Sequence, residues 1–126
     1  MATPFTIGLE KISVTIANGQ SLSPAIGLGA KALFAIAMPS GWDAAAITFQ
    51  AATDDSTWLE LYDDTGTAIS ITTAASRYVV LSSPVKLLGV RGIKVRSGTS
   101  GAAVNQTADR VLGLDRKSTR LNSSHT

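Results

Sequence analysis

The stretch ITFQAATDDSTWLELYDDTGTAISI, residues 47–71, decides how this chain folds. Apolar and polar residues alternate along 47–52, which is the period-two pattern of a half-buried strand. Two acidic segments, 53–56 and 63–66, have the composition of tight turns and separate three strand-like segments. We therefore expect a three-stranded antiparallel meander with two acidic turns.

The rest of the chain continues in short strand-like segments. Residues 31–38, KALFAIAM, are apolar on both faces and are expected to form a central strand. The segment 22–29 carries Pro24 and two glycines and is expected at an edge or a bulge. The other strand-like segments are 11–16, 77–81, 90–96 and 110–114.

This pattern predicts an all-β protein. Eight to nine short strands, separated by turns and without a helix longer than a turn or two, are typical of an antiparallel β-sandwich of the jelly-roll or galactose-binding type. The length of 126 residues fits one domain, which we place at residues 1–114. No segment has the length and apolar composition of a membrane span or an export signal, so we expect no membrane association.

The composition argues against an enzyme. The chain has no cysteine and a single histidine, His125, so nucleophile–base pairs of the Ser-His or Cys-His type have no native candidate. No glycine-rich phosphate-binding loop is present, because GLGAKAL lacks the required spacing. We therefore expect no catalytic residues and no cofactor.

Residues 115–126, DRKSTRLNSSHT, break the pattern of the preceding sequence. The string RKSTRLNSSHT resembles a peptide found where sequencing-adapter DNA has been translated, and we interpret the tail as non-native or disordered. It holds Arg116, Lys117 and Arg120 against Asp115, which leaves eight basic and eight acidic residues in 1–114. The positive net charge of +2 thus belongs to the tail.

The acidic turns allow two interpretations. An aspartate in a turn accepts hydrogen bonds from nearby backbone N–H groups, and we expect this role. The alternative is a weak Ca²⁺ site, although the two turns are expected at opposite ends of one strand and lack the regular calcium-loop spacing. The candidate ligands are Asp54, Asp55, Asp63 and Asp64.

The second half of the domain is basic. A nucleic-acid surface is not expected, because Tyr78 is the only aromatic residue after Tyr62 and the domain's net charge is zero. Contacts between subunits and ordinary outward-facing charges remain as two explanations. The polar loop 97–109 is a candidate contact arm. The candidate contact residues are Arg77, Arg91, Lys94, Arg96 and Asn105, and Lys86 and Arg110 complete the basic set.

Three large aromatic residues, Trp42, Trp58 and Tyr62, lie near the expected loops. Buried, they would anchor the core, and in a chain with few aromatic residues this is the expected use. Exposed, they would form a platform on which a carbohydrate can stack.

Two segments, ITFQAATDDSTWLELYDD (47–64) and SRYVVLSSPVKLLGVRGIKVRSG (76–98), resemble the turn-Asp, Trp and Arg-Tyr strands of discoidin-like galactose-binding domains. The likeness covers about half of the chain. Asp55 stands where those domains carry a glycine, and their flanking cysteine pair is absent. The resemblance implies a β-sandwich, and fold alone does not imply sugar binding.

A broader likeness covers nearly the whole of residues 1–114. The pieces SGW (40–42), TFQAATD (48–54), LYDD (61–64), SRYVVL (76–81) and RSGTSGAAVNQ (96–106) are similar to small structural proteins of tailed phages and gene-transfer agents. Those proteins are called head-fibre, spike or decoration proteins. The resemblance implies a virion component, assembled in the cytoplasm of a bacterial host and present in many copies.

The sequence thus predicts a phage virion structural protein that acts through protein–protein contacts. Its expected partners are other virion proteins and further copies of itself, without nucleic acid. The alternative is a carbohydrate-binding module or an adhesin for a host-surface glycan.

Overall fold

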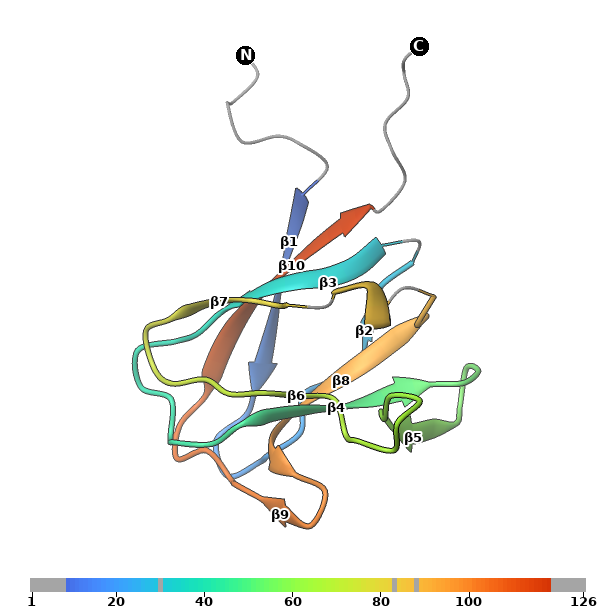
Figure 1. The fold of residues 1–126 in the computed structure, drawn as a ribbon. Coiled ribbons are helices and arrows are strands. Elements are labelled where there is room, and N and C mark those ends of the chain that lie inside the picture. The colour runs from blue at the N-terminus through green and yellow to red at the C-terminus, as the bar shows by residue number, and fades with distance from the viewer. Residues whose placement is uncertain (1–8, 30, 83, 88, 119–126) are drawn as a thin grey trace, which may run out of the picture.

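A computed structural model describes residues 9–29, 31–82, 84–87 and 89–118. Within them the chain is all-β, with ten strands in two antiparallel sheets and one short 3₁₀ helix, Pro84–Leu87. The two sheets face each other and make a sandwich, as the sequence predicts (Figure 1). No helix in the described part of the chain is long and apolar enough to cross a membrane.

The first sheet has four strands in the order β1-β10-β3-β7. Its interior strand β3 covers Lys31–Ala37, which confirms the predicted central strand. Strands that are neighbours in this sheet come from distant parts of the chain. The last strand, β10, lies between β1 and β3. Their bounds are β1 (Leu9–Ile16), β7 (Tyr78–Val80) and β10 (Arg110–Ser118).

The second sheet has the order β2-β8-β4-β5, and two further short strands extend it: β6 pairs with β4, and β9 pairs with β8. The short strand β2 lies at the end of this order, as expected for its proline-containing segment. The bounds are β2 (Ile26–Gly27), β4 (Ile47–Ala52), β5 (Trp58–Glu60), β6 (Ser70–Ile71), β8 (Gly92–Thr99) and β9 (Ala102–Ala103).

The core lies between the two sheets and is built from the inward positions of the strands. Phe49, Ile93 and Leu114 are at most 1% exposed and come from three different strands. Complete burial of one such side chain contributes about 1.5–3 kcal/mol. The buried cluster therefore fixes which face of each strand points inward.

The predicted meander is confirmed in part, because Leu61 and Tyr62 pair with Ile69 and Ala68, but the end of the third strand pairs elsewhere. Both β5 and β6 pair with β4, on the same side of it, instead of lying in the order β4-β5-β6. The residues between them form a separate small hairpin, in which Tyr62 bridges to Ala68. The turn of this hairpin closes within five residues, with the N–H of Asp63 donating to the carbonyl of Thr67.

The predicted end of the domain at Leu114 does not match the structure. Strand β10 continues to Ser118, and Asp115 is only 3% exposed. This strand pairs with β1 on one side and with β3 on the other, and side-chain bonds of Asp115 to Tyr78 and of Arg116 to Glu10 also hold it past the change in composition. Residues 119–126, including His125, lie outside the described residues.

Candidate functional site: two sheet faces and one open edge

The two acidic turns are held by their first aspartates. The Asp54 carboxylate accepts hydrogen bonds from the backbone N–H of Ser56, at 2.9 Å, and of Thr57, at 2.8 Å. These bonds hold the pKa of Asp54 below its ordinary value. The Asp63 carboxylate accepts bonds from the N–H of Thr65, at 2.9 Å, and of Thr67, at 3.1 Å. The turn-capping role is confirmed for both residues.

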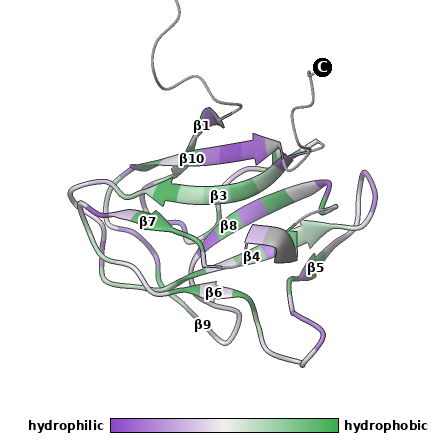
Figure 2. Cartoon of the chain, turned by 45° about the horizontal axis from the view of Figure 1, so that its top comes forward, coloured by the Kyte–Doolittle hydropathy of each residue, from purple (hydrophilic) through white to green (hydrophobic). Residues whose placement is uncertain are grey.

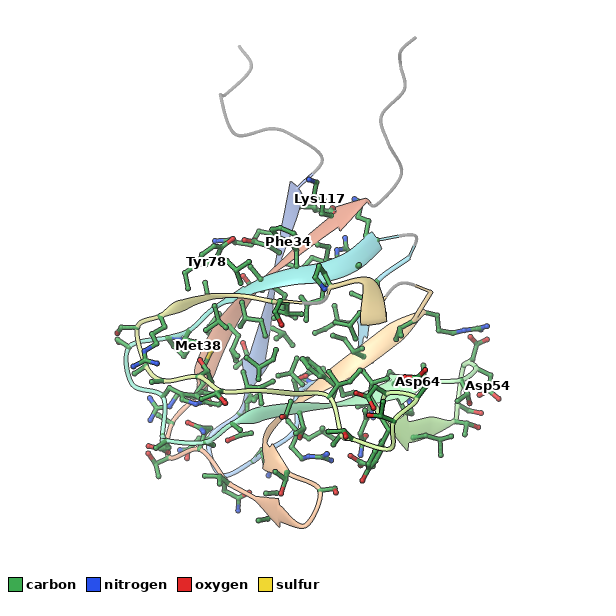
Figure 3. All side chains as sticks on the ribbon, viewed as in Figure 1. Phe34, Met38, Asp54, Asp64, Tyr78 and Lys117 are labelled. Carbon is green, nitrogen blue, oxygen red and sulfur yellow. The ribbon has the colours of Figure 1, made fainter. Side chains whose placement is uncertain are left out.

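The calcium interpretation finds no support in this geometry. Across the described part of the chain, no three His, Asp or Glu side chains lie together in a way that could hold a metal ion. Asp55 and Asp64 are exposed in their turns. Figure 3 shows Asp54 and Asp64 on the side of the molecule that carries β5.

The three aromatic candidates have different environments. Trp42 is 6% exposed, and its indole N–H donates to the carbonyl of Ala45 at 3.1 Å, so it belongs to the core and is not a surface platform. Trp58 is half-buried, with the Lys94 ammonium 4.6 Å from the ring centroid. Tyr62 is 52% exposed on the small hairpin. Of the two tryptophans, Trp58 alone remains available to a ligand.

Arg96 differs from the expected free surface cation. It faces away from the core, as predicted, but is only 7% exposed, because it lies in an ion pair. Its two terminal nitrogens donate to the two carboxylate oxygens of Glu60, and its Nε donates to the Thr48 hydroxyl at 3.0 Å. These bonds from Arg96 are the main reason that the pKa of Glu60 lies below its ordinary value.

Arg110 is also paired within the molecule. Its guanidinium lies 3.4 Å from the Asp43 carboxylate, which also accepts a bond from the Thr107 N–H at 2.6 Å. That backbone bond is the largest cause of the lowered pKa of Asp43. Arg77 and Arg91 are exposed. The basic half therefore offers fewer free charges for subunit contacts than its sequence indicates.

The loop 97–109 is not a free contact arm. It includes the end of β8 and the short strand β9, and it is fixed to the body by Gln106, which is 1% exposed. The Gln106 amide bonds to the backbone of Asp43 and to the Ser97 hydroxyl. Asn105 is exposed beside it. The sequence gives no signal for this role, since Asp43, which bonds to the Gln106 amide twice, lies 63 residues away along the chain.

The outer face of the first sheet carries an apolar strip that the sequence analysis missed. Tyr78, Val80 and Val111 are each more than half exposed although they are large and hydrophobic. Figure 2 shows β3 and β7 as predominantly hydrophobic strands. Figure 3 shows Phe34 and Tyr78 on this sheet. The alternation of Tyr78 and Val80 with the half-buried Val79 was the available signal.

Tyr78 lies across this sheet instead of standing away from it. The register places it opposite Ala37, and its hydroxyl donates to Asp115 two strands away. The small side chains of Ala35 and Ala37 leave room for the ring to cross β3. The bond to Asp115 raises the pKa of Tyr78 to about 12. The ring therefore makes a broad, flat apolar surface beside the edge of the sheet.

Strand β7 forms an open edge of the sandwich. It pairs with β3 on one side and with no strand on the other within the described residues. Behind it lies a cleft of about 420 Å³, bounded on one side by residues 67–72 and on the other by residues 79–82 and Leu87. This edge combines unpaired backbone groups with the exposed apolar side chains of Tyr78 and Val80.

Comparison of the chain with protein families, with curated proteins and with solved structures finds no match.

Proposed function

We propose that this protein is a virion structural subunit of the head decoration, fibre or spike type, which acts through contacts between β-sandwich edges. The observation that supports the proposal best is the open edge β7 with its exposed apolar side chains. Unpaired strand edges are templates for pairing with another chain, and most proteins protect them with charges, proline or bulges. The virion setting is our inference from the sequence pieces that resemble phage structural proteins, such as SRYVVL (76–81).

The other edges of the two sheets are better protected. The edge strand β1 carries Glu10 and Lys11, and Glu10 forms ion pairs with Lys31 and Arg116. The edge strand β2 has only two residues, and β5, which has three residues like β7, ends on the charged Glu60. Strand β7, Tyr78–Val80, contains neither a charged residue nor a proline. Edge pairing at β7 is therefore the contact with the least opposition.

The sequence of β7 is suited to pairing with its own copy. Two copies of β7 can pair antiparallel about a two-fold axis that passes through Val79. Tyr78 of each subunit then lies opposite Val80 of the other. An aromatic residue facing a β-branched residue is a favourable cross-strand pair, of about 0.2–1 kcal/mol. Two four-stranded sheets would join into one continuous sheet of eight strands, with the apolar strips on the same side.

The oligomeric state tests this contact. We expect size-exclusion chromatography with light scattering to show a discrete oligomer for the wild-type chain and a monomer for Val80→Lys, because a charge on the edge opposes pairing. Val111→Lys is the matched control: Val111 is 53% exposed on the same face but lies on the interior strand β10. A monomeric wild-type chain, or equal effects of both variants, would contradict the edge contact.

The place of the protein in a virion is tested separately. Particles of a phage that encodes this chain should contain it in many copies when their proteins are measured by quantitative mass spectrometry. Absence of the polypeptide from purified particles would reject the virion function even if the edge contact were found.

A further inference from the structure

The outer face of the second sheet has a different character from the apolar strip. Side chains cross it in rows, because residues opposite each other in the register share a face. Lys94, Gln50 and Glu60 form one row across β8, β4 and β5. Gly92, Ala52 and Trp58 lie beside it, with Ala52 opposite Trp58. The first row is polar, and the second holds an aromatic ring beside two very small residues.

The indole of Trp58 lies flat across the sheet. A Cβ atom built on Gly92 would be 3.8 Å from the Cη2 atom of Trp58 and 3.8 Å from the Cβ atom of Ala52. Trp58 starts on β5, so its ring must cross β4 over Ala52 to come so close to β8. One face of the ring therefore rests on the sheet, and the other is directed outward, where the Lys94 ammonium lies 4.6 Å from the ring centroid.

Charged groups of both signs surround this platform. Glu60 is neutralised by Arg96, which holds both of its carboxylate oxygens. Lys94 forms no ion pair within the described residues, and its ammonium lies over the Trp58 ring. Arg91, next to Gly92 in the chain, is exposed. The platform therefore has two cations, Lys94 and Arg91, beside an aromatic surface, and the exposed carboxylates of Asp54 and Asp55 lie in the β4–β5 turn at its end.

Hydrogen-bonding groups lie on one side of the ring. The Gln50 amide donates to Glu60 at 3.2 Å, and the Glu60 side chain is 33% exposed, so its carboxylate can accept further bonds. A flat apolar surface, a cation and fixed polar groups match a pyranose ring that carries a carboxylate. Its carboxylate would draw the Lys94 ammonium away from the ring, its C–H face would then stack on Trp58, and a hydroxyl would donate to Glu60.

We propose that the outer face of β8, β4 and β5 binds an acidic saccharide, with Trp58 as the stacking platform and Lys94 as the partner of the carboxylate. A nucleic acid fits less well, because a strand of phosphates needs several free cations and Arg96 is already held by Glu60. The site lies on the sheet opposite the one that carries β7, so a subunit could be assembled through one sheet and bind a glycan with the other.

Intrinsic tryptophan fluorescence measures this binding directly. Trp42 is buried and serves as a constant background, so a change of emission reports on Trp58. The probes are two matched pairs that differ in their carboxylates: sialyllactose with lactose, and trigalacturonate with galactotriose. We expect at least one acidic probe to shift the emission, to bind more weakly as salt is raised, and to bind about tenfold more tightly than its neutral counterpart.

Three variants distinguish this site from unspecific binding. Trp58→Ala should weaken binding of the acidic probe about tenfold or more, measured by calorimetry because the signal is lost. Lys94→Gln should weaken the acidic probe about tenfold and leave the neutral one unchanged. Leu59→Ala is the matched control, since Leu59 is 58% exposed on the same strand but points to the other side of the sheet.

Several outcomes would overturn the proposal. One is the absence of any response to both acidic probes up to about 10 mM, tenfold above a millimolar dissociation constant. Another is binding that persists unchanged in Trp58→Ala or in Lys94→Gln. A single-stranded oligonucleotide that binds more tightly than both acidic saccharides, with the same dependence on Trp58, would assign the face to a different class of ligand.

Discussion

Removal of the Glu60 carboxylate should destabilise the fold through its effect on Arg96. The Arg96 side chain is 8% exposed, and its two terminal nitrogens donate hydrogen bonds to the Glu60 carboxylate. In Glu60→Ala the charge of Arg96 would remain on the sheet. Among the described residues, the Thr48 hydroxyl would be its one remaining hydrogen-bond partner. An unpaired buried charge is among the most costly defects that a single substitution creates.

The size of the effect follows from burial. Breaking a fully buried ion pair by removing one partner costs about 3–5 kcal/mol. The Glu60 side chain is 33% exposed, so water can reach the orphaned nitrogens and reduce the cost to about 2 kcal/mol. With a urea dependence of about 2 kcal/mol/M for a domain of this size, the unfolding midpoint should fall by about 1 M.

A double-mutant cycle tests the reasoning. Arg96→Met combined with Glu60→Ala removes both charges and should recover most of the loss, because an apolar replacement of a buried pair is often neutral or stabilising. The assay is urea unfolding followed by far-UV circular dichroism, with the slope compared among all four proteins. A midpoint shift below about 0.25 M for Glu60→Ala, or full additivity in the double variant, would refute a buried ion pair.

The same pair predicts how stability depends on acid. The pKa of Glu60 is lowered from its ordinary value of 4.5 in the folded state, mainly by the bonds from Arg96. The stability contributed by the ionised carboxylate is therefore fully present above pH 4.5 and is lost as the pH falls through the lower folded pKa. Asp43 and Asp54 have pKa values shifted in the same direction, so the difference between wild type and Glu60→Gln isolates the contribution of Glu60.

Three further predictions concern other parts of the fold. A chain that ends at Leu114 should be less stable than one that ends at Ser118, in thermal unfolding, because the residues removed pair with both β1 and β3. The absorbance of Tyr78, taken as the difference between wild type and Tyr78→Phe, should titrate near pH 12, and the stability that depends on its protonated hydroxyl should be lost as the pH rises toward that value. Gly98→Ala should cost about 1–3 kcal/mol in urea unfolding, since Gly98 has φ 93° and an added Cβ would lie 2.5 Å from the Ala102 carbonyl oxygen. Gly101→Ala, with no atom within 4 Å of the added Cβ, should be close to neutral.

Local sequence pattern was sufficient for the fold class. Alternation in 11–16 and 47–52, and the two-sided apolar segment 31–38, correspond to strands β1, β4 and β3. The turn-capping aspartates were predictable as well, because an Asx turn depends on neighbours two to four residues away. Features that depend on nearby residues were therefore readable from the chain.

Features that depend on distant pairing were not readable. The position of β10 between β1 and β3 results from contacts across about a hundred residues, and no local pattern specifies it. The pairing of β6 with β4 instead of β5 is of the same kind. The burial of Arg96 depends on Glu60, which lies 36 residues earlier and two strands away. Both residues looked like ordinary surface charges because their partners could not be identified from the sequence.

The two outer sheet faces illustrate why function was harder to predict than fold. Tyr78 and Trp58 occupy comparable positions, each lying flat over small residues of the neighbouring strands. Tyr78 lies on the open edge β7, beside the exposed Val80, and its hydroxyl is held by Asp115. Trp58 has a cation over its ring and polar groups beside it. The first environment favours another protein surface and the second favours a polar, charged ligand, so the neighbours of each ring, set by strand order, determine what it can bind.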